Sequence, residues 1–293
     1  MAAVLVAGAT GTTGSAVLRQ LVGAGVQVRA LTRSHDRLAG LRGPGVTPVV
    51  ADFADRAQLR AALDGVTAAY LATPSSPDMA VTEGTFARAA ADAGVHLVKL
   101  STMGASPDSP LRFARMHAQS EAAIEAAGGG WTFLQPNGFM QNDLAWAAQV
   151  PSGTIAGPVL DSAWSIVDVR DVAGVAAAAL TDPAGHAQHR VVVTGPQARA
   201  PRDRVAALVA VLGRRLTVID VPVPAVLEQL RGYGLSSWEA DGIGELLDLY
   251  VQGVATGVVA GVDGILGRPR KTWEDFALDH AGVFSAAVSP ATG

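Results

Sequence analysis

The stretch Gly8-Ala9-Thr10-Gly11-Thr12-Thr13-Gly14 decides the fold of this chain. It follows a short apolar run at residues 4–7, which predicts a strand, and it opens a run at residues 12–22 with helical periodicity. A glycine-rich turn between a strand and a helix is typical of the phosphate loop of a dinucleotide-binding domain. The context carries this inference, because the same glycine spacing alone is a weak signal.

The glycine spacing assigns a separate role to each glycine of the loop. Gly8 would permit the tight turn, Gly11 would let the backbone approach a pyrophosphate, and Gly14 would allow close helix–strand packing. The start of the helix would offer free N–H groups and a partial positive charge to the phosphates. Three threonines add hydroxyl donors: Thr10, Thr12 and Thr13.

The first half of the chain alternates β-branched runs with Ala-rich amphipathic runs, which predicts βαβ units and a parallel sheet. We expect strands at residues 4–7, 26–31, 46–50, 66–71, 96–100 and 131–134, and helices at 12–22, 34–41, 55–63, 79–93 and 111–127. After Pro136 we expect strands at 164–167, 190–194 and 216–221, helices at 168–180, 205–212, 225–230 and 236–251, and a tail at 282–293 without a periodic pattern. The interpretation is an α/β fold with a Rossmann-type doubly wound parallel sheet. Residues 1–135 form its cofactor-binding domain, and residues 136–293 interleave the remaining Rossmann elements with a smaller C-terminal substrate lobe.

Composition narrows the class of protein further. Of 293 residues, 49% are hydrophobic, enough for a sizeable core, and the formal net charge of -4 comes without a basic block that would favour nucleic acid. The chain has no cysteine, which excludes disulfides and thiolate catalysis. It has neither a signal-peptide pattern at its start nor about 18 uninterrupted apolar residues. We therefore expect a cytoplasmic protein with a small-molecule substrate and no metal, and leave a homodimer open.

The end of the second expected strand predicts which dinucleotide binds. An NAD-binding domain places a carboxylate there to accept from the ribose 2′-hydroxyl. This chain has Leu31-Thr32-Arg33-Ser34 instead, and Arg33 could form a charge-assisted fork on a 2′-phosphate. The predicted cofactor is therefore NADP(H). Residues after the third, fourth and fifth strands complete its expected site: Asp52, Phe53, Ala72, Thr73, Pro74 and Ser101.

These motifs together resemble the NmrA-like family of atypical short-chain dehydrogenase/reductases. The resemblance rests on residues 8–14, 31–33, 52–53, 131–142, 168–173, 267–269 and 272–276. It spans nearly the whole chain. The family contains NADPH-dependent quinone and dye reductases and also redox-sensing regulators. The resemblance implies that residues 135–142 cross into the substrate lobe and that 168–173 begin a helix beneath the cleft. Its expected substrate-binding residues are Met103, Phe113, Asn137, Phe139, Met140 and Asn142.

One departure from ordinary short-chain dehydrogenases concerns the proton donor. Their Tyr-x-x-x-Lys pair protonates a carbonyl oxygen and holds the nicotinamide ribose, and this chain has no such pair. Phe113 stands where the tyrosine would be and His117 where the lysine would be, on one helical face with Glu121. The candidate catalytic residues are therefore His117, as a weak general acid, and Thr102. The alternative is that His117 simply bonds to Glu121 or to solvent.

Other residues that could take part in catalysis or metal binding are better explained by structural roles. Lys99 lies inside a strand pattern, where an ion pair or a strand-edge position is favoured over catalysis. The spacing His186-x-x-His189 could suggest a metal site, but a polar surface loop is favoured. Asp168 and Asp171 fit N-capping and dipole stabilisation of a helix better than paired catalytic carboxylates.

Three functions remain open from the sequence. The first is an NADPH-dependent reductase that transfers hydride to a conjugated quinone, enone or iminium-type acceptor, which needs less acid help and so fits the lost tyrosine. The second is a cofactor-binding redox sensor without turnover. The third is a biosynthetic enzyme that uses the bound cofactor for cyclisation or dehydration.

Overall fold

A computed structural model describes residues 3–33, 40 and 43–286 of the chain. Its internal contacts divide the chain into two compact units, and each consists of several separate segments. Unit 1 contains Met1–Pro136, Val169–Val193 and Gly261–Arg268, and unit 2 contains Asn137–Asp168, Thr194–Ala260 and Pro269–Gly293. Most of the helix expected at residues 34–41 falls on residues outside the described ranges.

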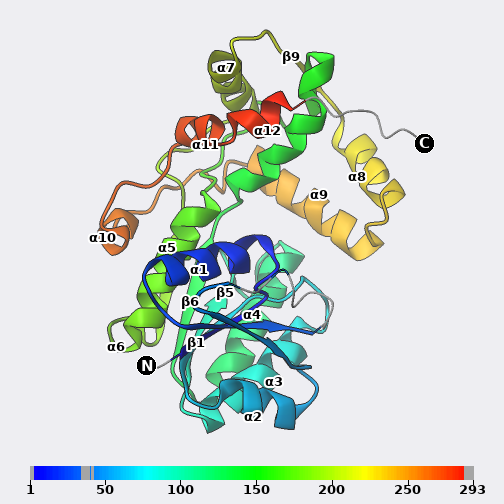
Figure 1. The fold of residues 1–293 in the computed structure, drawn as a ribbon. Coiled ribbons are helices and arrows are strands. Elements are labelled where there is room, and N and C mark those ends of the chain that lie inside the picture. The colour runs from blue at the N-terminus through cyan, green and yellow to red at the C-terminus, as the bar shows by residue number, and fades with distance from the viewer. Residues whose placement is uncertain (1–2, 34–39, 41–42, 287–293) are drawn as a thin grey trace, which may run out of the picture. The chain divides into compact units, whose positions relative to one another are not determined.

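Unit 1 is built on a seven-stranded parallel sheet with the order β3-β2-β1-β4-β5-β6-β8 (Figure 1). Its strands are β1 (Ala3–Ala7), β2 (Val28–Thr32), β3 (Val46–Val50), β4 (Val66–Leu71), β5 (His96–Leu100), β6 (Trp131–Pro136) and β8 (His189–Val193). The chain order reverses between β1 and β4, and Val6 pairs with Ala30 on one side and Tyr70 on the other. In open α/β sheets, ligands bind outside the carboxyl ends of the strands at such a switch point.

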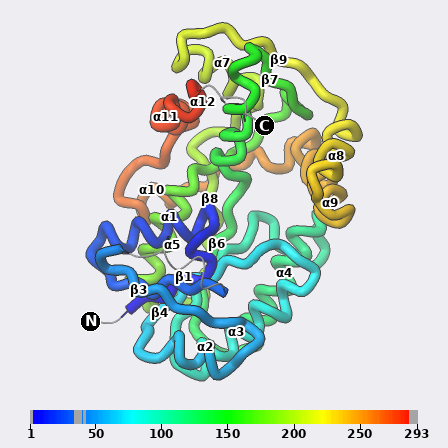
Figure 2. The backbone as a smooth tube through the Cα atoms, turned by 45° about the vertical axis from the view of Figure 1, so that its right-hand side comes forward, coloured from blue at the N-terminus to red at the C-terminus, as the bar shows by residue number. Residues whose placement is uncertain are grey.

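Helices cover both faces of this sheet. One face carries α1 (Thr12–Gly23) and α5 (Val169–Thr181), and the other carries α2 (Arg56–Leu63), α3 (Met79–Asp92) and α4 (Arg112–Glu125) (Figures 1 and 2). Two short helices, α6 (Pro183–His186) and α10 (Val262–Leu266), complete unit 1. A layered α/β core results, in which Leu5, Phe86 and Phe133 have no exposed surface.

Unit 2 is mainly helical, with a two-stranded parallel sheet of β7 (Thr154–Gly157) and β9 (Thr217–Asp220). Its helices are η3 (Met140–Ala148), η4 (Val150–Ser152), α7 (Pro201–Leu212), α8 (Val223–Gly232), α9 (Ser237–Val251), α11 (Trp273–Asp279) and α12 (Ala281–Ser285). The Ser236 hydroxyl accepts from the amide of Glu239, and the Glu239 carboxylate accepts from the Ser236 amide. This capping box fixes the start of α9 at the residue that the sequence predicted.

The structure corrects three expectations in the second half of the chain. Residues 164–167 do not form a strand, because Trp164 and Val167 each make only an isolated bridge. The sequence missed β7, a four-residue strand whose partner lies about sixty residues later. The tail begins with α12, where Phe284 is fully buried. None of the helices in the described part of the chain has both the length and the apolar character needed to cross a membrane.

Candidate functional site

The glycine-rich loop follows β1 and has almost no space for side chains at two of its glycines. Gly8 has a φ of +78°, and a Cβ atom there would lie 2.4 Å from the backbone oxygen of Ala72. A Cβ on Gly14 would lie 2.1 Å from the backbone oxygen of Gly8. Gly11 is less restricted, since its Cβ would lie 3.3 Å from that oxygen. Packing against Ala72 therefore requires glycine at position 8, packing within the loop requires it at position 14, and Gly11 lies on the exposed surface of the loop.

The first turn of α1 fits an anion. Its N-cap is Gly11, which supplies no side-chain hydrogen bond to the helix, so no capping side chain occupies the amides of the first turn. Thr10 and Thr12 are exposed beside these amides. Thr13 differs from the expectation, because its side chain is only 7% exposed and lies in the interior. The predicted phosphate contact of its hydroxyl is therefore disfavoured, and a contact through its backbone amide stays a prediction.

The residues predicted for the adenosine end lie after β2 and β3, which are neighbours in the sheet. Arg33 is exposed in the bend after β2, with its side chain accessible to a ligand. Asp52 is exposed after β3, and its Oδ1 accepts from the amide of Ala54 at 3.0 Å. Phe53 is 9% exposed and its ring centroid lies 5.1 Å from that of Phe86. Phe53 is therefore mainly a core residue, and only its small exposed edge could contact an adenine.

The residues predicted near the nicotinamide ribose follow β4 and β5, which are also neighbours. The Thr73 hydroxyl donates to Glu83 Oε1 at 2.7 Å, and the Ser101 hydroxyl donates to Glu121 Oε1 at 2.5 Å. Both hydroxyl protons thus have acceptors inside unit 1. Ala72 contributes the carbonyl that approaches Gly8, and Pro74 is exposed.

Thr102 and Met103 follow Ser101 and are half-buried. The Met103 amide donates to the carbonyl of Pro136 at 2.9 Å, so the chain after β5 is tied to the end of β6. This bond fixes the backbone of both residues at the carboxyl edge of the sheet. The predicted catalytic role of Thr102 stays a prediction.

The helix at the position of the lost Tyr-x-x-x-Lys pair is α4. Phe113 lies in its first turn and is half-buried, so no phenol is present there. His117 contacts Lys99, with 2.7 Å between His117 Nδ1 and Lys99 Nζ. Burial and the neighbouring Lys99 ammonium hold the pKa of His117 well below its ordinary value. This direction disfavours His117 as a general acid, and its predicted catalytic role stays a prediction.

Glu121 is not the partner of His117. It is 3% exposed and accepts from Ser101, from Gln135 Nε2 at 2.9 Å and from Arg190 Nε at 3.0 Å. The Arg190 guanidinium lies over the ring of Trp131, with its Cζ 5.1 Å from the ring centroid. Glu121 thus joins β5, β6 and β8 to α4, and the alternative reading of an exposed His117–Glu121 pair is wrong.

Lys99 forms the ion pair that the sequence favoured over catalysis. Its Nζ lies 3.5 Å from Glu83 Oε2, and neither side chain has any exposed surface. The Glu83 carboxylate also accepts from Thr73 and from Ser120. Sequence reasoning missed Glu83 and Ser120. A signal was present for Lys99, a charge between the apolar residues Val98 and Leu100 of a strand, but α3 carries other charges and so did not single out Glu83.

In unit 2, the predicted substrate residues lie at the start of the segment that leads into η3. Both polar atoms of the Asn137 side chain make hydrogen bonds within the protein: Nδ2 donates to Ser165 Oγ at 2.9 Å and Oδ1 accepts from the Gly138 amide at 2.8 Å. Met140 is 2% exposed and belongs to the core. Phe139 is half-buried and Asn142 is exposed. Of these four residues, Phe139 and Asn142 are the ones with surface available for a ligand.

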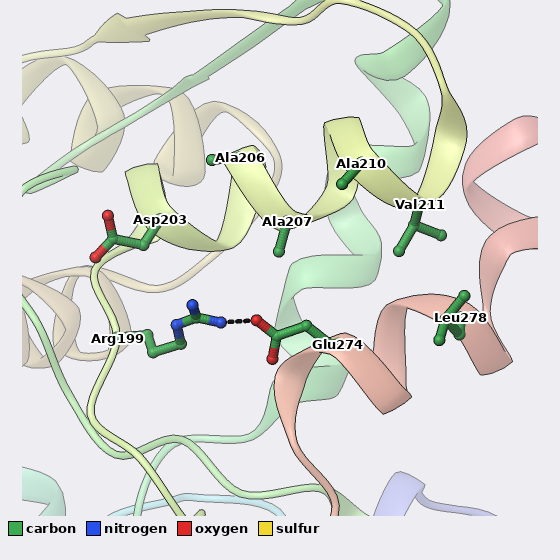
Figure 3. Close-up of a pocket in the computed structure, with 8 residues that line it drawn as sticks. All are labelled: Arg199, Asp203, Ala206, Ala207, Ala210, Val211, Glu274 and Leu278. Carbon is green, nitrogen blue, oxygen red and sulfur yellow. Dashed lines mark hydrogen bonds and ion pairs between the residues drawn. The ribbon is translucent and has the colours of Figure 1, made fainter.

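A groove of about 610 Å³ lies elsewhere in unit 2 (Figure 3). An Arg199–Glu274 ion pair crosses it between the segment before α7 and the start of α11. The lining residues are Arg199, Asp203, Ala206, Ala207, Ala210, Val211, Glu274 and Leu278. None of the predicted site residues lines this groove.

Two other carboxylates are also placed by the structure. Asp171 is fully buried in the first turn of α5 and pairs with Arg268 at 2.7 Å. Asp168 accepts from Gln141 Nε2 at 3.0 Å. Both therefore have structural partners at the start of α5, and the N-capping role that the sequence favoured stays a prediction.

The two histidines of the His186-x-x-His189 spacing lie on two different elements. His186 ends α6, and His189 begins β8 and is exposed. Across the described ranges, no group of three or more His, Cys, Asp or Glu residues is arranged to hold a metal ion.

The sheet order and the phosphate loop define a Rossmann-type α/β protein with a dinucleotide loop at the β1–α1 junction. Comparison with known proteins identifies the family: the NmrA-like family model matches residues 2–247. The chain belongs to the NmrA-like family.

Curated relatives match along nearly the whole chain. An NAD(P)H azoreductase from Xenophilus azovorans is 36% identical over 97% of this chain and 100% of its own length. A (4-alkanoyl-5-oxo-2,5-dihydrofuran-3-yl)methyl phosphate reductase from Streptomyces griseus subsp. griseus is 38% identical over 96% of this chain and 99% of its own length. Among solved structures, an NADPH-dependent quinone oxidoreductase from Escherichia coli complexed with NADPH has a TM-score of 0.83 and 25% identity, covering 96% of this chain and 100% of that one.

Proposed function

We propose that this protein is an NADPH-dependent reductase that transfers hydride to a conjugated, electron-poor small molecule of the quinone, enone or iminium type. The observation that carries the proposal is a phosphate loop at the β1–α1 junction in a chain whose α4 has no tyrosine at the expected position of the proton donor. Gly8, Gly11 and Gly14 form the loop and Phe113 replaces the tyrosine. Burial and the neighbouring Lys99 lower the pKa of His117, which makes it a poorer source of a proton. When bound, NADPH supplies the hydride.

The residues after the second strand support the choice of NADPH. Arg33 is exposed beside the site expected for the ribose, and a guanidinium suits a 2′-phosphate through paired hydrogen bonds. The relative solved with NADPH and the azoreductase named for NAD(P)H agree with this choice.

The missing acid supports the choice of acceptor. When hydride adds to a quinone or an enone, the negative charge spreads over the conjugated system, so the transition state needs less protonation than that of an isolated ketone. A neutral donor or a water molecule can then complete the proton transfer. The names of the two curated relatives refer to an azo bond and to a carbonyl-bearing dihydrofuran ring, and both acceptors contain double bonds.

The test follows NADPH absorbance with a panel of acceptors and one matched pair: an α,β-unsaturated ketone and its saturated counterpart. We expect turnover with the quinone, the enone and the azo or cationic dye, and at least about 100-fold slower turnover with the saturated ketone, the scale of a missing general acid. Tight NADPH binding without turnover across the panel would contradict the proposal and favour a cofactor-binding sensor. Equal rates on both ketones would contradict the argument from the missing acid.

A further inference from the structure

The buried contact between Lys99 and His117 sets the protonation of the histidine ring. Lys99 Nζ has three acceptors within reach: the carbonyl of Leu100 at 2.9 Å, His117 Nδ1 at 2.7 Å and Glu83 Oε2 at 3.5 Å. An ammonium carries three protons and no lone pair. All three protons are thus assigned, and the one directed at the ring requires Nδ1 to be an acceptor.

The charge on Lys99 follows from the groups around Glu83. The Thr73 hydroxyl reaches Oε1 and the Ser120 hydroxyl reaches Oε2, so both carboxylate oxygens accept hydrogen bonds. An ionised carboxylate with no exposed surface needs a cation nearby, and Lys99 is the cation that contacts it. Burial lowers the pKa of Lys99, and the Glu83 carboxylate opposes this shift. The hydrogen bonds around Glu83 favour an ammonium paired with a carboxylate over a neutral amine that accepts from the ring.

We propose that Lys99 is a positioning residue: it fixes His117 as the neutral tautomer with its proton on Nε2, so that α4 presents a hydrogen-bond donor in place of an acid. In neutral imidazole, one nitrogen donates when the other accepts. Its Nε2–H suits an oxygen acceptor, such as a ribose hydroxyl of the cofactor or a carbonyl of the substrate. The use of this donor in turnover rests on the proposed function, whereas the tautomer does not.

The surrounding charges support one protonation state over a wide pH range. The Lys99 ammonium faces the ring from β5, and its ion-pair partner Glu83 lies on α3. Glu121 lies one turn along α4, but its carboxylate accepts hydrogen bonds from Ser101, Gln135 and Arg190. A second proton on His117 would place two cations 2.7 Å apart and break the contact. The donor therefore persists from mildly acidic to mildly basic pH.

The direct test is ¹⁵N NMR of the histidine rings, which does not depend on activity. In the wild-type protein we expect His117 Nδ1 to stay unprotonated and Nε2 to stay protonated from pH 5.5 to 8. In the Lys99→Met/Glu83→Gln variant, which buries no uncompensated charge, the ring should titrate within this range. Ser120→Ala is the matched control, because it removes one hydrogen bond to the Glu83 carboxylate but retains both charges, and it should retain the tautomer. A wild-type ring with its proton on Nδ1, or one that titrates above pH 5.5, would overturn the proposal.

Turnover provides a second readout. His117→Gln keeps an N–H close to the position of Nε2–H and should keep most of kcat, whereas His117→Leu should lose about tenfold, the effect of one hydrogen bond that strengthens in the transition state. The wild-type kcat should be independent of pH from 5.5 to 8. If the tautomer is fixed but no acceptor turns over, the proposed function fails and the assignment of Lys99 stands. If turnover is present but Gln and Leu are equivalent, the donor role is refuted.

Discussion

The glycines of the phosphate loop differ in how much space the structure leaves for a side chain. At Gly14 a side chain would collide with the backbone of the loop itself, whereas at Gly11 it would point toward the exposed surface where a pyrophosphate would approach. The same three-residue spacing thus contains two glycines that the packing requires, Gly8 and Gly14, and one, Gly11, that we expect to be needed mainly for the ligand. This difference gives a test that separates binding from stability.

Gly11→Val should abolish NADPH binding while the protein stays folded, because the tightest contact of an added Cβ there, at 3.3 Å, requires only a small adjustment. Gly14→Ala should lower the thermal unfolding midpoint markedly, because its Cβ would lie 2.1 Å from a backbone oxygen that cannot move aside cheaply. Calorimetric titration and thermal unfolding of both variants measure the two effects. Normal NADPH binding by Gly11→Val would show that the phosphates lie elsewhere.

Arg33 is the residue expected to choose between the two dinucleotides. Because it stands where a carboxylate would select NAD, NADPH should bind more tightly than NADH, and Arg33→Ala should weaken NADPH binding by about one to two decades, or roughly 1.5–3 kcal/mol for hydrogen bonds to a charged group. NADH binding should change little. Titrations of both cofactors into both proteins, with Arg19→Ala on the exposed side of α1 as the control, measure this preference. Equal affinities of the wild-type protein for the two cofactors would refute it.

At the scale of elements, local sequence patterns were sufficient to predict those helices and strands whose boundaries are marked by their own residues. The expected strands at 46–50, 66–71 and 96–100 match β3, β4 and β5 to the residue. Each is a run rich in β-branched or apolar residues that is bounded by turns, so both ends are visible in the sequence, although β3 lies at the edge of the sheet and is only half-buried. The helices after them follow from their apolar periodicity.

Contacts between elements that are distant in the sequence could not be predicted from local patterns. The sequence places His117 and Glu121 on one helical face and so suggests that they pair, but His117 meets Lys99 of β5 and Glu121 meets Arg190 of β8. Which strand lies beneath α4 depends on sheet order, which no local pattern contains. β7 was missed for a related reason, since four residues acquire strand geometry only by pairing with β9.

At the scale of the whole chain, a buried ion pair in unit 2 joins three segments that are far apart in the sequence. Local patterns could not predict this pair either. Arg204 of α7 donates to Asp143 Oδ2 of η3 at 2.7 Å, and Trp273 Nε1 of α11 donates to the same oxygen at 2.8 Å. Arg204 is 1% exposed, and its Cζ lies 4.6 Å from the ring centroid of Trp164. Burial raises the pKa of Asp143 to about 6, although Arg204 and Trp273 oppose this shift. The pair is thus costly to desolvate and depends on both partners being present.

Removing one partner of this pair should therefore cost more than removing both. Asp143→Leu and Arg204→Met should each lower the free energy of unfolding by about 3–5 kcal/mol, because each leaves a buried charge without its partner. The double variant should recover part of that loss, since apolar side chains of similar size need no desolvation of charge.

Arg202→Met is the matched control: it lies on the same helix, but its partners Asp161 and Asp220 are on the surface, so the unfolding midpoint should hardly change. Urea denaturation of the four variants and the wild-type protein at pH 7.5, above the raised pKa of Asp143, measures the coupling. If the double variant loses the sum of the two single losses, the pair is not coupled, and the three segments are held together by their apolar contacts alone.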